Sequence, residues 1–195
     1  MFLSKELLLA RAKEYDYKPE ILEKVYRLLN TLKQFMDVPY LAKRLVLKGG
    51  TALNLFCFED IPRLSVDIDL NYIGQLDREK MLEERTVINN AIRQIIQQND
   101  FELYRNPGHH AGGKIVWRYA SVLGQGGNIE IDLNYMYRKP LWPYAKLQPI
   151  LSFDEDFAMH VLDVHELAAG KLSALFTRHA SRDLFDANYL FTKCK

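Results

Sequence analysis

Apolar residues recur at helical spacing in four parts of the chain. Residues 4–14 and 19–36 place them three and four positions apart, which predicts two amphipathic helices at the start. The same period returns over residues 76–100, where one apolar stripe is typical of a helix packed on a sheet. The tail is predicted to be helical over residues 164–189, with a break near residues 179–181.

Shorter apolar segments between these helices are typical of strands. The run within residues 41–48 ends at Gly49-Gly50, which predicts a buried strand followed by a turn. Thr51 comes next, at or near a helix N-cap, so we expect a short helix over residues 51–58.

Three further strands are predicted over residues 64–72, 114–122 and 128–135, the last two joined as a hairpin through a glycine-rich turn. Strands that alternate with helices, between helical ends, predict an α/β or α+β fold. The expected organisation is N-terminal helices over residues 1–40, a core over residues 41–150 and the start of a helical C-terminal part over residues 151–195. Because the last helix reaches the final residue without a stop signal, we expect the chain to be truncated.

Composition narrows the class of protein. The chain has 195 residues, of which 48% are hydrophobic and 26% charged, as in an ordinary globular protein. Its 26 basic and 25 acidic residues give a net charge of +1, so any nucleic-acid binding would depend on a local patch. Two distant cysteines argue against a disulfide framework and a cysteine-ligated zinc site. No apolar run is long enough for a membrane span and no signal peptide is evident, so a cytoplasmic protein is expected.

Two aspartates share one face of the strand predicted over residues 64–72. Because side chains alternate along a strand, Asp67 and Asp69 point to one side while Ile68 and Leu70 point into the core. Neighbouring carboxylates repel each other unless a cation lies between them, and Mg²⁺ prefers such ligands together with phosphate oxygens. The pair is a candidate Mg²⁺ site, and the alternative is the solvated acidic face of an edge strand.

A glycine turn precedes these aspartates in the chain. Lys48-Gly49-Gly50-Thr51 lies where a strand is expected to pass into a helix, and glycine lets a phosphate approach the backbone closely. The Thr51 hydroxyl would then donate to a phosphate oxygen. The alternative is a tight turn with a threonine cap.

A third carboxylate is available from another predicted strand. Glu130 and Asp132 share one face of the strand over residues 128–135. Three carboxylates on two strands suit two-metal phosphoryl transfer, in which one ion activates the attacking hydroxyl and the other stabilises the leaving pyrophosphate.

Other candidate residues allow two interpretations each. His109-His110 permits a metal site, but its Gly and Pro neighbours favour a loop. Base stacking is permitted by Trp117, Arg118, Tyr119, Tyr135 and Tyr137, although aromatic residues in strands more often pack against the core.

Four motifs occur in a fixed order between residues 41 and 190: LKGGTAL at 47–53, PRLSVDIDL at 62–70, ELAAGKLSAL at 166–175 and RDLFD at 182–186. Together they closely resemble the AbiEii/AbiGii-type toxins, a branch of the polymerase-β-like nucleotidyltransferases. Gly170 stands where that family usually has another residue. The resemblance implies a nucleotidyltransferase core with a mixed sheet, flanked by the N-terminal helices and the helical C-terminal part.

The resemblance also implies roles for single residues. It makes Asp67, Asp69 and Asp132 metal ligands, with Glu130 as the second choice for the third position. The implied catalytic residues are Asp67, Asp69, Asp132, Lys171 and Asp186. The implied nucleotide-binding residues are Lys48, Gly49, Gly50, Thr51, Ser65, Arg182 and Asp183. Arg63 reaches the phosphates or only solvates a loop, and the pattern does not decide between these.

The activity implied is Mg²⁺-dependent transfer of a nucleoside monophosphate from an NTP to an acceptor hydroxyl, in a toxin of a toxin–antitoxin or abortive-infection system. The implied partners are an NTP, a tRNA 3′ end or other RNA as acceptor, and a cognate antitoxin. A local cluster of Lys139, Lys146, Arg178 and Arg182 would supply positive charge for RNA. The alternative hypothesis is a non-catalytic nucleotide-binding module that acts through the antitoxin.

Overall fold

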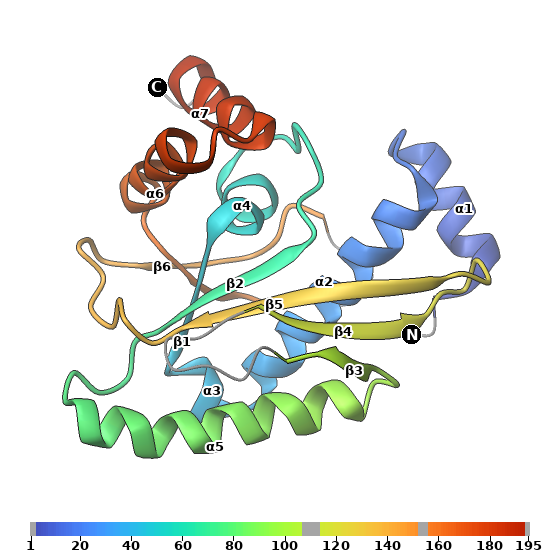
Figure 1. The fold of residues 1–195 in the computed structure, drawn as a ribbon. Coiled ribbons are helices and arrows are strands. Elements are labelled where there is room, and N and C mark those ends of the chain that lie inside the picture. The colour runs from blue at the N-terminus through green and yellow to red at the C-terminus, as the bar shows by residue number, and fades with distance from the viewer. Residues whose placement is uncertain (1–2, 107–113, 152–155, 194–195) are drawn as a thin grey trace.

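A mixed β-sheet forms the centre of the molecule (Figure 1). The computed structural model describes residues 3–106, 114–151 and 156–193. Within these residues the sheet has seven strands in the order β3-β4-β5-β2-β1-β7-β6. The strands are β1 (Leu45–Lys48), β2 (Asp67–Tyr72), β3 (Glu102–Arg105), β4 (Ile115–Ala120), β5 (Gly126–Asn134), β6 (Ala145–Leu147) and β7 (Met159–Val161).

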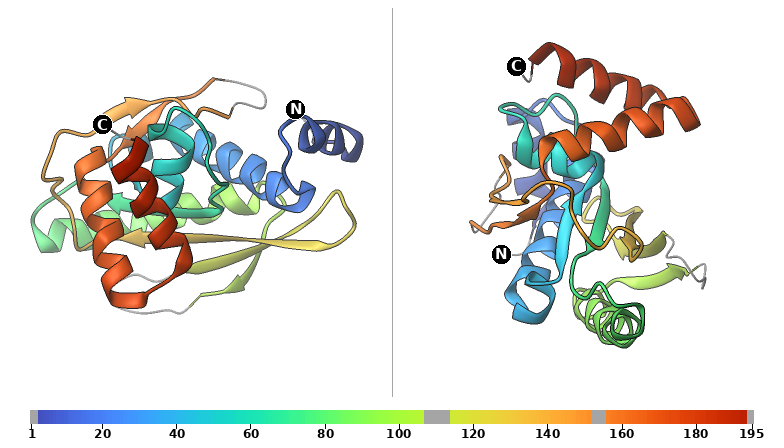
Figure 2. Two further views of the ribbon diagram at one scale, coloured as in Figure 1. Left: turned by 90° about the horizontal axis from the view of Figure 1, so that it is seen from above. Right: turned by 90° about the vertical axis from the view of Figure 1, so that its left-hand side faces the viewer.

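Helices cover both faces of this sheet. They are α1 (Lys5–Glu14), α2 (Pro19–Asp37), α3 (Pro39–Ala42), α4 (Gly49–Ala52), the π-helix η1 (Leu53–Cys57), α5 (Arg78–Gln97), α6 (Val164–Arg178) and α7 (Ser181–Lys193). In Figure 1, α4, α6 and α7 lie above the sheet, while α3 and α5 lie below it and α2 passes behind it. Seen from above, α6 and α7 lie side by side over the strands (Figure 2).

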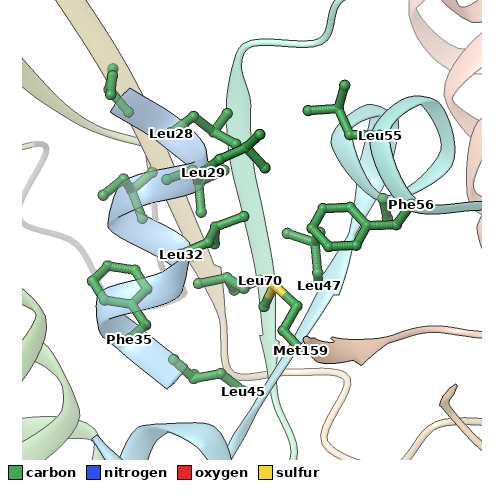
Figure 3. Close-up of a cluster of buried hydrophobic side chains, with 14 of the residues drawn as sticks. Leu28, Leu29, Leu32, Phe35, Leu45, Leu47, Leu55, Phe56, Leu70 and Met159 are labelled. Atoms are coloured by element: carbon green, nitrogen blue, oxygen red, sulfur yellow. The ribbon is translucent and has the colours of Figure 1, made fainter. Parts of the chain in front are cut away.

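The core forms where α2 packs against the central strands. Leucines of α2 recur every three or four residues, so that they meet the apolar face of β1 and β2 (Figure 3). Leu28, Leu32, Leu47 and Leu70 have no exposed surface. Because strand side chains alternate, burying Leu47 and Leu70 turns their neighbours Lys48 and Asp69 to the opposite face, beneath α4 and α6.

The structure confirms the predicted fold class, a mixed α/β arrangement with helical flanks. The helices at both ends and the break near residue 179 are also as predicted: His179 ends α6 in the left-handed conformation, with φ of 52°. The start of one predicted helix differs from the structure. The helix expected to begin at Thr51 begins at Gly49, and Lys48 is its N-cap residue. Thr51 therefore lies inside the helix and does not cap it.

Four short elements were not predicted from the sequence: α3, β3, β6 and β7. Each has only three or four residues, too few to show a period of 2 or 3.6. Their partners fix them instead, because β7 pairs with β1 and β6 pairs with β7.

Candidate active site

Four carboxylates lie on one face of the sheet, on two adjacent strands. β2 and β5 run parallel, with Asp67 opposite Glu130 and Asp69 opposite Asp132. Residues paired across a ladder point to the same face of a sheet, so both pairs face α4, α6 and α7. Strand pairing thus brings together residues that are more than 60 positions apart in the chain.

Asp69 lies among both acidic and basic groups. Burial raises the pKa of Asp69, the Lys48 ammonium lowers it, and the charges of Asp67 and Asp132 raise it further, with a net shift upward. Burial is the largest cause of this shift and disfavours the ionised form. A bound cation would favour that form.

Lys114 spans two of the carboxylates. Its Nζ lies 3.1 Å from Asp67 Oδ2 and 2.9 Å from Glu130 Oε2. Burial opposes the charged ammonium, but the hydrogen bonds to Glu130 and Asp67 outweigh it and raise the pKa of Lys114. A cation of the protein itself thus occupies this edge of the acidic face.

Two glycines bring the backbone close to the acidic face. Gly49 has φ of +76°, and a Cβ added there would lie 2.2 Å from Asp69 Oδ2. A Cβ on Gly50 would lie 3.0 Å from Arg63 Nη2 and 3.3 Å from Lys171 Nζ. Because Gly50 has no side chain, its backbone can approach Ser65, Arg63 and Lys171 closely.

The hydroxyl groups next to Gly50 hold the turn together. Thr51 is fully buried, and its Oγ1 donates to the carbonyl oxygen of Asp67 at 2.5 Å. Thr51 Oγ1 also lies 3.1 Å from Ser65 Oγ. Thr51 thus connects the helix to the start of β2, and its hydroxyl already donates its hydrogen bond to the backbone.

A buried charge network lies behind the two cations. Asp186 has no exposed surface, and its carboxylate accepts from Arg63 Nε at 2.7 Å and Nη2 at 2.6 Å. Lys171 Nζ lies 2.8 Å from Asp186 Oδ2, and Asn54 Nδ2 donates to Oδ1 at 3.3 Å. Burial would raise the pKa of Asp186, but the hydrogen bonds from Arg63 and Lys171 outweigh it and lower the pKa.

Asp183 forms the second half of this network. Arg178 donates to both of its oxygens, at 2.6 and 2.8 Å, and Lys171 Nζ lies 3.4 Å away. The hydrogen bonds from Arg178 lower the pKa of Asp183 to about 2. Lys171 is therefore fixed between two buried aspartates. Arg182, by contrast, is half-exposed and turns toward the sheet, with Nη1 3.8 Å from Asp67 Oδ2.

The family model described as "Nucleotidyl transferase AbiEii toxin, Type IV TA system" matches residues 31–194. The chain belongs to this AbiEii family. This confirms the resemblance predicted from the four motifs and the class of enzyme that it implied, a nucleotidyltransferase toxin.

Solved structures show the same fold as this AbiEii chain. MenT4, the nucleotidyltransferase toxin Rv2826c from Mycobacterium tuberculosis H37Rv, has a TM-score of 0.62 and 22% identity, and covers 98% of this chain and 65% of its own. JHP933 from Helicobacter pylori has a TM-score of 0.54 and 20% identity, and covers 86% of this chain and 67% of its own. The chain thus spans about two thirds of the length of each. The search of curated proteins gives no match.

The structure gathers most of the predicted site residues of this AbiEii chain around one face. Asp67, Asp69, Asp132, Lys48 and the glycine turn meet there as predicted. Lys171 lies beside them, but Asp183 and Asp186 are buried behind it and contact cations of the protein. Asp186 pairs with Arg63 and Lys171.

Three contributors were missed or left open by the sequence. Lys114 was read only as the start of a strand, and Arg178 only as part of a basic cluster. Arg63 was undecided, and its ion pair with Asp186 now places it in the network. No local signal marks these contacts, because Arg63 and Asp186 are 123 positions apart. His109 and His110 lie outside the described residues.

The donor set fits a divalent cation. AbiEii nucleotidyltransferases generally use divalent metal ions, and carboxylate oxygens are what Mg²⁺ prefers. Among the described residues no three His, Cys, Asp or Glu side chains already converge on one point. The fit is therefore to an ion that completes its shell with phosphate oxygens and water. Burial and the charges of Asp67 and Asp132 raise the pKa of Asp69, and a bound cation would oppose that shift.

Two further predictions concern the aromatic residues of the strands and the absence of a membrane span. Trp117, Tyr119 and Tyr135 are buried, so packing accounts for these three, whereas Tyr137 is exposed. No helix in the described part of the chain is both long and apolar enough to cross a membrane.

Proposed function

We propose that this chain transfers a nucleoside monophosphate from an NTP to an acceptor hydroxyl and releases pyrophosphate, with Mg²⁺. One observation carries the proposal. Carboxylates from two strands face a group of fixed cations across a glycine turn. Metal ions and a triphosphate together complement both sets of charge.

The cations bind the triphosphate. A phosphate oxygen near Gly50 meets the guanidinium of Arg63 and the ammonium of Lys171, because both lie within 3.3 Å of the missing Cβ position. Asp186 and Asp183 act as positioning residues, since each is fully buried and holds these cations in place.

The carboxylates hold Mg²⁺. Asp67, Asp69 and Asp132 are its ligands in this proposal, and a two-metal site follows from the same three residues. When bound, Mg²⁺ neutralises charge on the triphosphate and lowers the pKa of the attacking hydroxyl. Asp132 accepts the proton of that hydroxyl. Glu130 is the second choice for this role, because Lys114 already binds its Oε2.

The acceptor in this proposal is RNA, with a tRNA 3′ end as the specific case, and the regulator is a cognate antitoxin. The family description names a type IV toxin–antitoxin system, which supports the antitoxin. A cytoplasmic site of action follows from such a substrate.

The test uses each NTP with a radiolabelled α-phosphate, in turn, with total RNA, with protein, and with and without Mg²⁺. The inactive variant is Asp67→Asn/Asp69→Asn, which keeps the side-chain volume. Glu102→Gln is the matched control, because it makes the same acid-to-amide change on the exposed edge strand β3. Mg²⁺-dependent NTP binding is measured in parallel by thermal shift.

Label in RNA with wild type and the Glu102 variant, but not with the double variant, is the expected result. Label in protein would redirect the acceptor while keeping the chemistry. Mg²⁺-dependent NTP binding without transfer to either acceptor would refute the enzyme and support the nucleotide-binding module.

A further inference from the structure

An exposed aromatic and basic segment follows β5. We define the aromatic strip as Tyr137, Lys139, Trp142, Tyr144 and Lys146, all exposed. Lys139 and Lys146 belong to the basic cluster predicted to supply positive charge for RNA, while the predicted catalytic and nucleotide-binding residues all lie outside the strip.

Two rings of the strip are held in place on one side and open on the other. The Trp142 ring stacks on His165, with centroids 6.0 Å apart, and Tyr144 packs on His160 at 4.8 Å. Trp142 still exposes 45% of its surface and Tyr144 exposes 40%. Pro140 and Pro143 also restrict the backbone. Fixed rings with an open face are suited to stack unpaired bases.

The charge of this segment differs from that of the whole chain. Residues 136–151 contain three basic residues, Arg138, Lys139 and Lys146, and no acidic residue, whereas the chain has 26 basic and 25 acidic residues. Arg138 donates hydrogen bonds to the carbonyl oxygens of Tyr135 and Leu76. Lys139 and Lys146 remain to meet phosphates beside the rings.

The strip is connected to two elements of the active site, β5 and α6. β5 carries Asp132 and runs directly into the strip. On its other side, the backbone N–H of Leu141 donates to Glu166 Oε2 at 2.9 Å, which ties the strip to the first turn of α6. Lys171 is five residues further along α6, a rise of roughly 7.5 Å at 1.5 Å per residue. A stacked strand advances about 3.4 Å per nucleotide, so the length of α6 between Glu166 and Lys171 equals that of about two stacked nucleotides.

We propose that the aromatic strip binds the single-stranded 3′ segment of an RNA acceptor, a few nucleotides before the hydroxyl that reacts. This rests on the proposed function, because only then does an RNA end enter the site. Unpaired bases stack on Trp142 and Tyr144, while Lys139 and Lys146 contact phosphates. In a duplex the bases already stack on one another, so the strip favours single strands.

The test measures binding of an unstructured 12-nucleotide RNA with a fluorescent 5′ end, by anisotropy, without NTP. Trp142→Ala is expected to weaken binding roughly 5- to 150-fold, the range for losing one stacked base. Trp142→Phe should retain most of the affinity. Lys146→Ala should reduce the salt dependence by about one phosphate contact. The matched control is Tyr104→Ala on β3 at the opposite edge of the sheet, where the ring is 59% exposed.

Circular dichroism and Mg²⁺-dependent ATP binding should stay unchanged in all four variants. Equal RNA affinity of Trp142→Ala and wild type would overturn the proposal. Loss of antitoxin binding with intact RNA binding would also overturn it and make the strip a protein interface. RNA bound through the strip without label transfer would support the strip and refute the proposed activity. Transfer of label to RNA with an unchanged KM for RNA in Trp142→Ala would support the proposed activity and refute the role of the strip.

Discussion

Removal of the buried carboxylate of Asp186 tests whether the charge network is a structural unit. In Asp186→Ala, Lys171 keeps only the 3.4 Å contact with Asp183, and Arg63 loses both of its hydrogen bonds to the carboxylate. Removing one partner of a buried ion pair costs about 3–5 kcal/mol, because the remaining charge stays buried. In a chain of this size about 1 kcal/mol shifts Tm by roughly 2–4 °C, so we expect a fall of about 6–20 °C.

A double-mutant cycle separates the lost pair from general damage. Lys171→Met removes the ammonium and keeps an apolar chain of similar length. Combined with Asp186→Ala, it should recover about 1–3 kcal/mol relative to the sum of the single variants. The free energy of unfolding is measured by urea titration with circular dichroism. Arg182→Ala is the control, since this half-exposed side chain should matter by less than about 0.5 kcal/mol.

The reasoning fails if Asp186→Ala costs less than about 1 kcal/mol, or if the single effects simply add. Either result would mean that Asp186 does not hold the cations in place. A direct catalytic role for Asp186 would then regain support over the positioning role.

Three further predictions follow from the site. Gly49→Ala should abolish NTP binding and lower the free energy of unfolding by about 1–3 kcal/mol or more, because φ is +76° and the added Cβ would lie 2.2 Å from Asp69 Oδ2. Thermal shift with and without NTP measures both effects. The matched control is Gly170→Ala, which should be neutral or stabilising because nothing lies within 4 Å of its added Cβ. The pKa of Asp183 is lowered from 3.8 to about 2, so its carboxylate should contribute about 2 kcal/mol to the free energy of unfolding. This contribution is present above pH 4 and is lost as the pH falls toward 2. Acid titrations of Asp183→Asn should lack that loss, and a parallel curve to wild type would contradict the assignment. Lys114→Met should bind Mn²⁺ about 2- to 30-fold more tightly by electron paramagnetic resonance, because two half-exposed ion pairs no longer compete, and weaker binding would refute the competition.

Local sequence patterns determined much of this protein. A period of 3.6 located α2 and α5, and a period of 2 placed Asp67 and Asp69 on one face of β2, because these patterns depend only on backbone geometry. The glycine turn and the helix break at His179 were also local. The four motifs were enough to predict the family.

Only the tertiary structure decided how distant charges combine. The parallel pairing of β2 with β5 sets Asp69 opposite Asp132, and the packing of α7 buries Asp186 against Arg63. Likewise, Lys114 reaches Asp67 across strands that are distant in sequence. A sequence shows which charged residues are present, but their ion pairs and burial depend on which surfaces come into contact. Long-range packing of the apolar faces determines which surfaces these are.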